Sequence, residues 1–155
     1  MAAARRRAPG FTLIEMLVVL ALIAAASALA AGVLTGGIAG LRLRSSASTI
    51  ASQLRYTRAQ ALATGEAQRF VIDPRAHRWS APHGHHGDVP PALGIEFIGA
   101  RETKPSPGEG AIVFFPDGAS TGGRVQLSAK RAAWNVDVTW LTGEVRVARA
   151  EAAQP

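Results

Sequence analysis

A long uncharged run near the N-terminus predicts a helix. Residues 16–41 comprise 26 positions without a charged side chain, and most of them are Ala, Leu, Val or Ile. A helix of about 20 apolar residues spans the roughly 30 Å hydrocarbon layer of a bilayer. A chain of 155 residues has too little other material to bury such a helix on every side. The run therefore predicts a transmembrane span rather than a core helix.

The helical period continues beyond this run, where it becomes amphipathic. Apolar residues recur on one narrow stripe at 100° per residue, on which Thr57 is the polar exception. The stripe consists of Leu43, Ala47, Ile50, Leu54 and Ala61. Gly65 is well placed to end the helix. We therefore expect an amphipathic half over 42–65. Three glycines between the two halves permit a bend or local melting, or alternatively close packing against neighbouring helices: Gly36, Gly37 and Gly40.

After Gly65 the period changes to short alternating segments separated by turn residues. We expect strands at Phe70–Ile72, through Trp79, and at Leu93–Phe97, Ile112–Phe115, Val125–Leu127, Trp134–Trp140 and Val145–Val147. Turn sequences such as Asp73-Pro74 and Pro116-Asp117-Gly118 indicate antiparallel hairpins. The predicted fold is α+β: a long N-terminal helix, with a transmembrane half and an amphipathic half, packs on antiparallel β-sheet hairpins over 66–150. Residues 151–155 form a tail.

Charge changes the picture less than its total suggests. The chain has 17 Lys and Arg against 11 Asp and Glu, a net charge of +6. Three of the basic residues, Arg5 to Arg7, precede the apolar run. The positive-inside rule then leaves the N-terminus in the cytoplasm and sends the rest of the chain across the membrane. The absence of cysteine excludes disulfides, thiol catalysis and Cys-ligated metals.

Glu15 stands at the front of the apolar run and needs a partner or an interface. A carboxylate in the apolar layer costs about 2.5–3.5 kcal/mol on insertion scales. If the chain were cut after Gly10, the new α-amino group of Phe11 could pair with Glu15 of the same or a neighbouring chain. Alternatively, Glu15 lies at the head-group level and the helix dipole stabilises it. A secretory signal peptide with a cleavage site among the alanines of 24–31 is a competing interpretation of the whole segment.

Two sets of residues resemble known families. Gly10-Phe11-Thr12-Leu13-Ile14-Glu15, between a basic leader and an apolar helix, resembles the type IV prepilin signature. The segment Phe114-Phe115-Pro116-Asp117-Gly118, then Gly122-Gly123 and residues 138–143, is similar to the GspH/FimT branch of minor pseudopilins and pilins. The resemblance covers most of the chain, with the exception of His77–Gly110.

The prepilin resemblance implies specific processing and assembly roles. A prepilin peptidase would remove leader 1–10 by cutting after Gly10 and would methylate Phe11. Glu15 would bring incoming subunits into register, and 11–41 would form the transmembrane and filament-core helix.

The GspH/FimT resemblance implies a structural subunit of the periplasmic pseudopilus of a type II secretion system, similar to the H-type subunit. It would lie at or near the tip and be anchored once in the bacterial inner membrane, with its C-terminal domain in the periplasm. Its partners would be other major and minor pseudopilins, the prepilin peptidase, the inner-membrane assembly platform and the lipid bilayer. Enzyme activity and cofactors are not expected.

Two other functions remain open at this stage. A FimT-like minor pilin of a type IV pilus could bind DNA for uptake through a basic patch whose phosphate contacts would be salt-dependent. Its candidate residues are Arg124, Lys130, Arg131, Arg146 and Arg149. A single-pass anchored enzyme or solute-binding domain is the third hypothesis.

Two further patterns are weak candidates for chemistry. His83, His85 and His86 could bind a metal, but their spacing matches no defined site, so we expect a solvated loop without metal. Residues 118–122 fit the G-x-S-x-G pattern, which as a nucleophile elbow requires a strand before it and a helix after it. An alternating strand is expected to follow instead, so this segment is predicted to be a turn.

Overall fold

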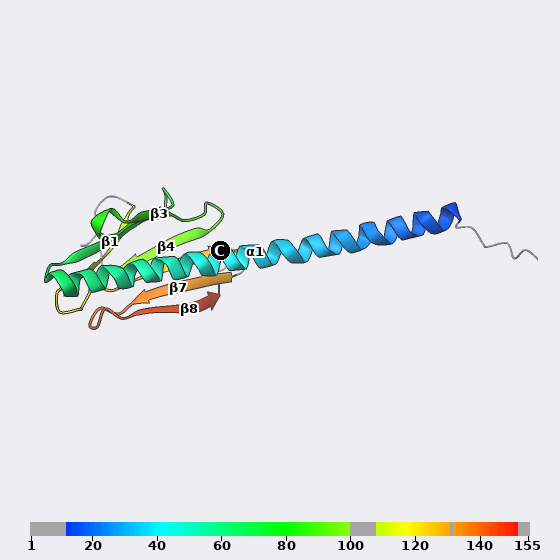
Figure 1. The fold of residues 1–155 in the computed structure, drawn as a ribbon. Coiled ribbons are helices and arrows are strands. Elements are labelled where there is room, and N and C mark those ends of the chain that lie inside the picture. Colours follow the sequence, from blue (N-terminus) through cyan, green and yellow to red (C-terminus); the bar gives the residue numbers. More distant parts are fainter. Residues whose placement is uncertain (1–11, 100–107, 131, 152–155) are drawn as a thin grey trace, which may run out of the picture. The chain divides into compact units, whose positions relative to one another are not determined.

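The computed structural model describes residues 12–99, 108–130 and 132–151, with side chains for 12–27, 39–99, 108–130 and 132–150. The chain forms two compact units, residues 1–38 and 39–155. A single helix, α1 (Leu13–Thr64), contributes to both units (Figure 1). It continues through Gly36, Gly37 and Gly40. The helix is unbroken at these glycines, so local melting is not observed there.

The second half of α1 buries the stripe that its sequence predicts. Leu43, Ala47, Ile50, Leu54 and Ala61 are all 0% exposed. Thr57 is buried among them because its hydroxyl donates to the Gln53 carbonyl at 2.8 Å, which satisfies the polar group within the helix. α1 ends before Gly65, whose φ of 70° is the left-handed conformation typical of a helix C-terminus. The predicted amphipathic half and its stop are confirmed.

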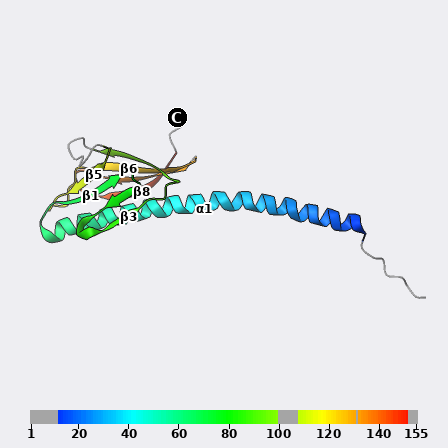
Figure 2. The ribbon, with the colours of Figure 1, turned by 90° about the horizontal axis from the view of Figure 1, so that it is seen from above.

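Over the described residues of the second unit, the remaining elements are eight strands and one short 3-10 helix (Figures 1 and 2). Their bounds are β1 (Gln68–Asp73), β2 (Arg78–Ser80), η1 (Pro82–Gly84), β3 (His86–Asp88), β4 (Gly94–Gly99), β5 (Gly110–Phe114), β6 (Gly123–Ala129), β7 (Ala132–Val138) and β8 (Val145–Glu151). They make two four-stranded antiparallel sheets in the orders β3-β2-β1-β5 and β4-β6-β7-β8. The α+β fold expected from the sequence is confirmed.

Both sheets contribute to one core with the second half of α1. The first sheet supplies Phe70, Ile72, Ile112 and Phe114, and the second supplies Val125, Leu127, Val136, Val138 and Val145. Burial alternates along β1 and β6, as expected for strands that carry one apolar face. Full burial of each large aliphatic or aromatic side chain contributes about 1.5–3 kcal/mol. The core is therefore the main source of stability for this unit.

Two predicted strands extend too far at their C-terminal ends. The alternation through Trp140 predicts a strand up to that residue, but β7 ends at Val138 and Trp140 is 67% exposed. The chain turns here because the Thr139 amide donates to the Glu144 carbonyl and the Gly143 amide donates to Thr139. Phe115 likewise lies beyond the end of β5 and is 40% exposed.

The two sheets are not built only from hairpins between successive strands. β5 pairs with β1, whereas β4 pairs with β6 of the other sheet. Along the described strands the chain therefore changes sheets three times, between β3 and β4, between β4 and β5, and between β5 and β6.

Candidate assembly site

The first turn of α1 carries the predicted assembly residue. α1 begins at Leu13, and the Glu15 amide donates to the carbonyl and the hydroxyl oxygen of Thr12, at 3.1 and 3.3 Å. Thr12 is thus the N-cap residue, and Glu15 stands three positions later, the spacing of a capping box. The observed cap is the Thr12 hydroxyl on the Glu15 amide, and the assembly role of the Glu15 carboxylate stays a prediction. Gly10 and Phe11, the predicted processing residues, lie outside the described residues.

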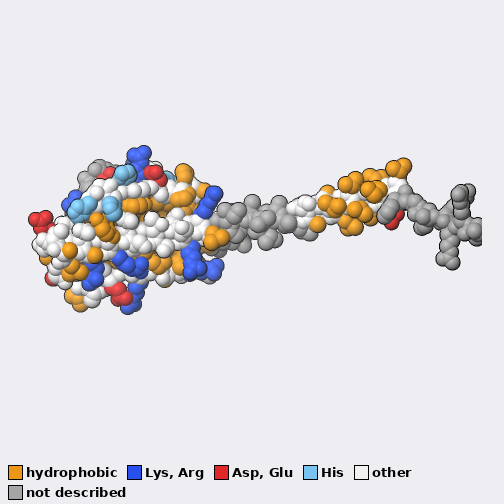
Figure 3. Space-filling view, viewed as in Figure 1, with side chains coloured by type: hydrophobic (Ala, Val, Ile, Leu, Met, Phe, Trp, Pro, Cys, Tyr) orange, Lys and Arg blue, Asp and Glu red, His pale blue; other side chains and the backbone are white. Residues whose placement is uncertain are grey.

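The described side chains of the first unit form a continuous surface that is exposed. Every side chain from Thr12 to Ser27 is exposed, and Leu13, Ile14 and Leu17 are 87%, 70% and 66% accessible. Figure 3 shows apolar side chains over much of the described part of this unit. Such a surface is far larger than the apolar patches of most soluble monomers. Within the part of the chain that the structure describes, no helix offers a stretch both long and apolar enough to cross a membrane.

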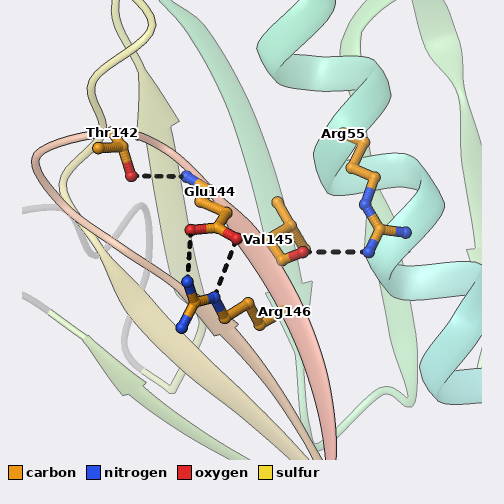
Figure 4. Close-up of polar contacts among 5 residues, drawn as sticks. All are labelled: Arg55, Thr142, Glu144, Val145 and Arg146. Atoms are coloured by element: carbon orange, nitrogen blue, oxygen red, sulfur yellow. Dashed lines mark hydrogen bonds and ion pairs between the residues drawn. The ribbon is translucent and has the colours of Figure 1, made fainter.

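Two arginines of α1 attach the helix to the loops of the second unit. Arg55 donates to the carbonyl of Val145 at 3.0 Å, where β8 begins (Figure 4). One helical turn later, Arg58 donates to the carbonyl of Gly118 at 3.1 Å, in the turn after β5. Hydrogen bonds from a charged donor are stronger than neutral ones. These bonds fix the positions of the two turns against the helix.

The serine of the G-x-S-x-G segment has a structural role. Ser120 is buried, its hydroxyl donates to the Thr139 carbonyl at 3.1 Å, and it accepts from the Gly122 amide at 3.0 Å. The segment is followed by β6 rather than by a helix. The predicted turn is confirmed, and the hydroxyl bridges the start of β6 to the end of β7.

The structure does not assemble the predicted basic patch into one cationic surface. Arg124 of β6, Asp137 of β7 and Arg146 of β8 form one cross-strand row, so an acid stands between two of the arginines. Arg124 forms an ion pair with Asp137. Arg146 binds Glu144 through two hydrogen bonds of 2.9 and 3.0 Å (Figure 4). That bidentate contact lowers the pKa of the Glu144 carboxyl and raises the pKa of Arg146.

The other basic candidates lie elsewhere. Arg149 is three residues after Arg146 on β8, so its side chain projects from the opposite face of the sheet. Lys130 stands in the turn between β6 and β7 with a φ of 53°. Arg131 lies outside the described residues. The sequence could not show this separation, because the face of each residue depends on the exact strand ends.

The histidine segment packs on α1 instead of extending into solvent as a loose loop. The rings of Tyr56 and His85 stack with centroids 4.6 Å apart and 6° between their planes. The Tyr56 hydroxyl lies 3.3 Å from Nδ1 of His83, and Nδ1 of His86 donates to the Gly84 carbonyl at 2.8 Å. Among the described residues, no group of His, Asp and Glu is arranged to hold a metal ion. The three histidines are exposed to solvent, as expected, but the segment forms η1 and β3 rather than a loop.

Comparisons with known proteins identify relatives for both parts of the chain. Residues 46–143 match the family described as Type II transport protein GspH, and residues 5–31 match the prokaryotic N-terminal methylation motif. A protein of Xanthomonas campestris pv. campestris named Type II secretion system protein H is 61% identical over 142 residues, which cover 92% of this chain and 84% of that protein.

Solved structures resemble the fold. The minor pseudopilin EpsH of Vibrio cholerae aligns with a TM-score of 0.57 at 15% identity, over 69% of this chain and 96% of that one. The type IV minor pilin FimU of Pseudomonas aeruginosa aligns with a TM-score of 0.51 at 14% identity, over 68% of this chain and 92% of that one. At these identities the likeness concerns the fold alone.

Proposed function

Because this chain belongs to the Type II transport protein GspH family, we propose that it is a minor pseudopilin, a structural subunit of the pseudopilus of a type II secretion system. The name of its 61% identical relative, Type II secretion system protein H, supports this system. The observation that carries the proposal is a single helix that bears an exposed apolar surface in one unit and the buried stripe of a helix–sheet core in the other. Such a chain can place a folded unit outside a membrane or filament core.

The N-terminal segment would be processed before assembly. A prepilin peptidase would cut between Gly10 and Phe11, remove 1–10 and methylate Phe11, and the match of residues 5–31 to the N-terminal methylation motif supports this step. Residues 11–41 would then anchor the chain once in the inner membrane, with 66–150 in the periplasm. Residues 42–65 would pack the helix on this periplasmic domain, and 151–155 would be a tail.

Assembly would replace lipid by other helices around the apolar surface. Ala- and Gly-rich helices without charges associate through close packing. Glu15, at the third position of α1, would meet the α-amino group of a neighbouring Phe11 and so set the register between subunits. The partners would be the major and other minor pseudopilins, first on the inner-membrane assembly platform and then near the tip of the periplasmic pseudopilus. The role is structural rather than enzymatic and requires no cofactor.

The DNA-binding alternative receives less support. Its candidate residues are divided between two faces of a sheet and a turn, and two of them are paired with acids. The likeness to FimU supports the fold rather than the pilus system.

Mass spectrometry of the membrane-extracted chain tests the proposal most directly. Co-expression with a prepilin peptidase should yield a chain that begins with N-methylated Phe11, and Gly10→Val should retain residues 1–10. Glu15→Gln should be processed normally but fail to restore secretion to a strain lacking this subunit. An intact Met1, or a cut near Ala31, would contradict the proposal. Restored secretion by an uncleavable variant would contradict the link between processing and assembly.

A further inference from the structure

We propose that one end of the second unit is a docking surface for anionic phospholipid head groups. The surface, called here the basic end, consists of Arg42, Arg44, Lys130 and Arg149. It lies where α1 enters the unit, and Figure 3 shows Lys and Arg side chains gathered there. The inference rests on the membrane anchoring in the proposed function and adds a second, electrostatic contact to it.

Three elements far apart in the sequence meet at the basic end. The guanidinium carbon of Arg44 lies 5.8 Å from the ring centroid of Trp134, within the range of a cation–π contact. Trp134, near the start of β7, is the cross-strand partner of Arg149 on β8. The β6–β7 turn that carries Lys130 closes between Ala129 and Ala132, at the same end of the sheet. Helix, turn and strand end thus meet at one end of the unit, where Arg44 and Arg149 both neighbour Trp134.

Among the described residues, no acid forms an ion pair with the basic end. All four side chains are exposed, and none of them forms an ion pair among the described residues. The arginines that are paired with acids lie elsewhere in the unit: Arg78, Arg124 and Arg146. The segments 39–45, 128–134 and 148–151 hold five basic residues, Arg131 included, against one acid, Glu151. This end therefore presents a net positive field.

Its position along the chain indicates lipid as the ligand. Arg42 is the first charged residue after Glu15, and the residues between them are the apolar run expected to span the bilayer. Basic clusters beside a span attract anionic lipids, and this attraction decays over a Debye length of about 10 Å at 0.1 M salt. A guanidinium group matches the geometry of a phosphate. Trp134 is half-buried, and indole rings favour the head-group region.

The opposite end of the second unit, called here the far end, serves as the control for the basic end. Arg58 lies 14 residues after Arg44 on α1, which is about 21 Å along the helix, and it contacts the turn that contains Gly118. Gly143 of the β7–β8 turn packs against the same carbonyl, so this turn belongs to the far end. Lipid contact at the basic end should leave the β7–β8 turn in solvent. Docking would therefore orient the unit before assembly.

The test uses the full chain in lipid nanodiscs. The native sequence has no cysteine, so Ala150→Cys near the basic end and Leu141→Cys in the far turn each give one labelling site. A fluorophore at each site is read against a quencher attached to lipid head groups. We expect stronger quenching at position 150 in discs of phosphatidylcholine with phosphatidylglycerol than in pure phosphatidylcholine. Quenching at position 141 should be weak in both.

Substitutions separate this contact from simple anchoring. Arg44→Gln with Arg149→Gln should reduce the ratio of docked to undocked chain by roughly 25-fold, about five-fold per residue. Arg69→Gln with Arg146→Gln removes the same charge away from the basic end and should leave the ratio unchanged. Salt at 1 M shortens the Debye length to about 3 Å and should release the wild-type contact.

Three other results would contradict either the docking surface or the membrane anchoring. Equal quenching in the two lipid compositions, or quenching that the Arg44/Arg149 substitutions leave unchanged, would overturn the docking surface. Duplex DNA that binds the chain in neutral discs through the same residues, without lipid discrimination, would assign the basic end to nucleic acid and also overturn it. A chain that enters neither type of disc would instead refute the membrane anchoring.

Discussion

Gly143 stands so close to the carbonyl oxygen of Gly118 that a methyl group on its Cα would overlap that oxygen. The same carbonyl accepts the hydrogen bond from Arg58, so the two turns and the helix meet at one point. Both glycines also have positive φ, 60° and 86°. Close approach and backbone conformation therefore both require glycine in the β7–β8 turn.

Gly143→Ala should destabilise the second unit by about 2–5 kcal/mol. A left-handed conformation costs a non-glycine residue about 1–2 kcal/mol, and the steric overlap adds an amount typical of overpacking, about 1–3 kcal/mol. Urea unfolding of the full chain in detergent measures the change. Gly65→Ala is the matched control, because Gly65 has a similar φ of 70° but open space around it. It should cost only about 1–2 kcal/mol, and an equal loss for both variants would refute the overlap.

Arg146→Gln should raise the pKa of Glu144 toward its usual value. The hydrogen bonds from Arg146 lower that pKa in the folded chain. A carboxyl whose folded pKa is depressed contributes stability above its unfolded pKa and loses this contribution as the pH falls through the folded pKa. The loss should be small and sensitive to salt because Glu144 is exposed. Titration of the Glu144 carboxyl carbon by NMR checks the shift, and Arg124→Gln should not move it.

Tyr56→Leu should release the histidine segment from α1. The substitution removes the Tyr56 ring that stacks on His85 and the hydroxyl near His83, and aromatic pairs contribute about 0.5–1.5 kcal/mol. Amide exchange across 83–86 should accelerate, and the upfield ring-current shift of the His85 protons should disappear. Tyr56→Phe retains the stack but not the hydroxyl, so it should keep most of the shift. Unchanged exchange in Tyr56→Leu would contradict an anchored segment.

Thr12→Ala should fray the first turn of α1. It removes the side-chain oxygen that accepts from the Glu15 amide, and loss of an N-cap costs about 0.5–2 kcal/mol of helix stability. Amide exchange at Glu15 in lipid bicelles should rise by about two-fold to thirty-fold accordingly. Thr12→Ser preserves the acceptor and should behave like the wild type. If the two variants exchanged equally fast, the hydroxyl would have no capping role.

Local patterns in the sequence predict where helices and strands lie better than they predict which elements pack against each other. The apolar stripe from Leu43 to Ala61 follows the period of an α-helix, so it was recognisable from the sequence without knowledge of the tertiary structure. The alternation through Trp140 misled because an exposed aromatic in a turn has the same spacing as one in a strand. The Tyr56–His85 stack was invisible, since nothing local indicates which helical turn meets a segment about 30 residues away.

The candidate sites show the same difference between local patterns and contacts that depend on the fold. The Glu15 motif was recognised because its six residues are contiguous. The basic patch was wrong as a single surface, because alternation along β8 places Arg146 and Arg149 on opposite faces and Glu144 pairs with Arg146. The basic end was not predictable, because Arg44 and Arg149 are brought together only by the order of the strands in the sheet.

The position of β8 has a consequence for the order of events during synthesis. β8 is the last strand in the chain, yet Val145 belongs to the core beneath α1, and Arg55 of the helix bonds to its backbone. The helix leaves the ribosome first but cannot complete its contacts until about 80 more residues have followed. The part of the core that Val145 closes therefore remains open until β8 has been synthesised.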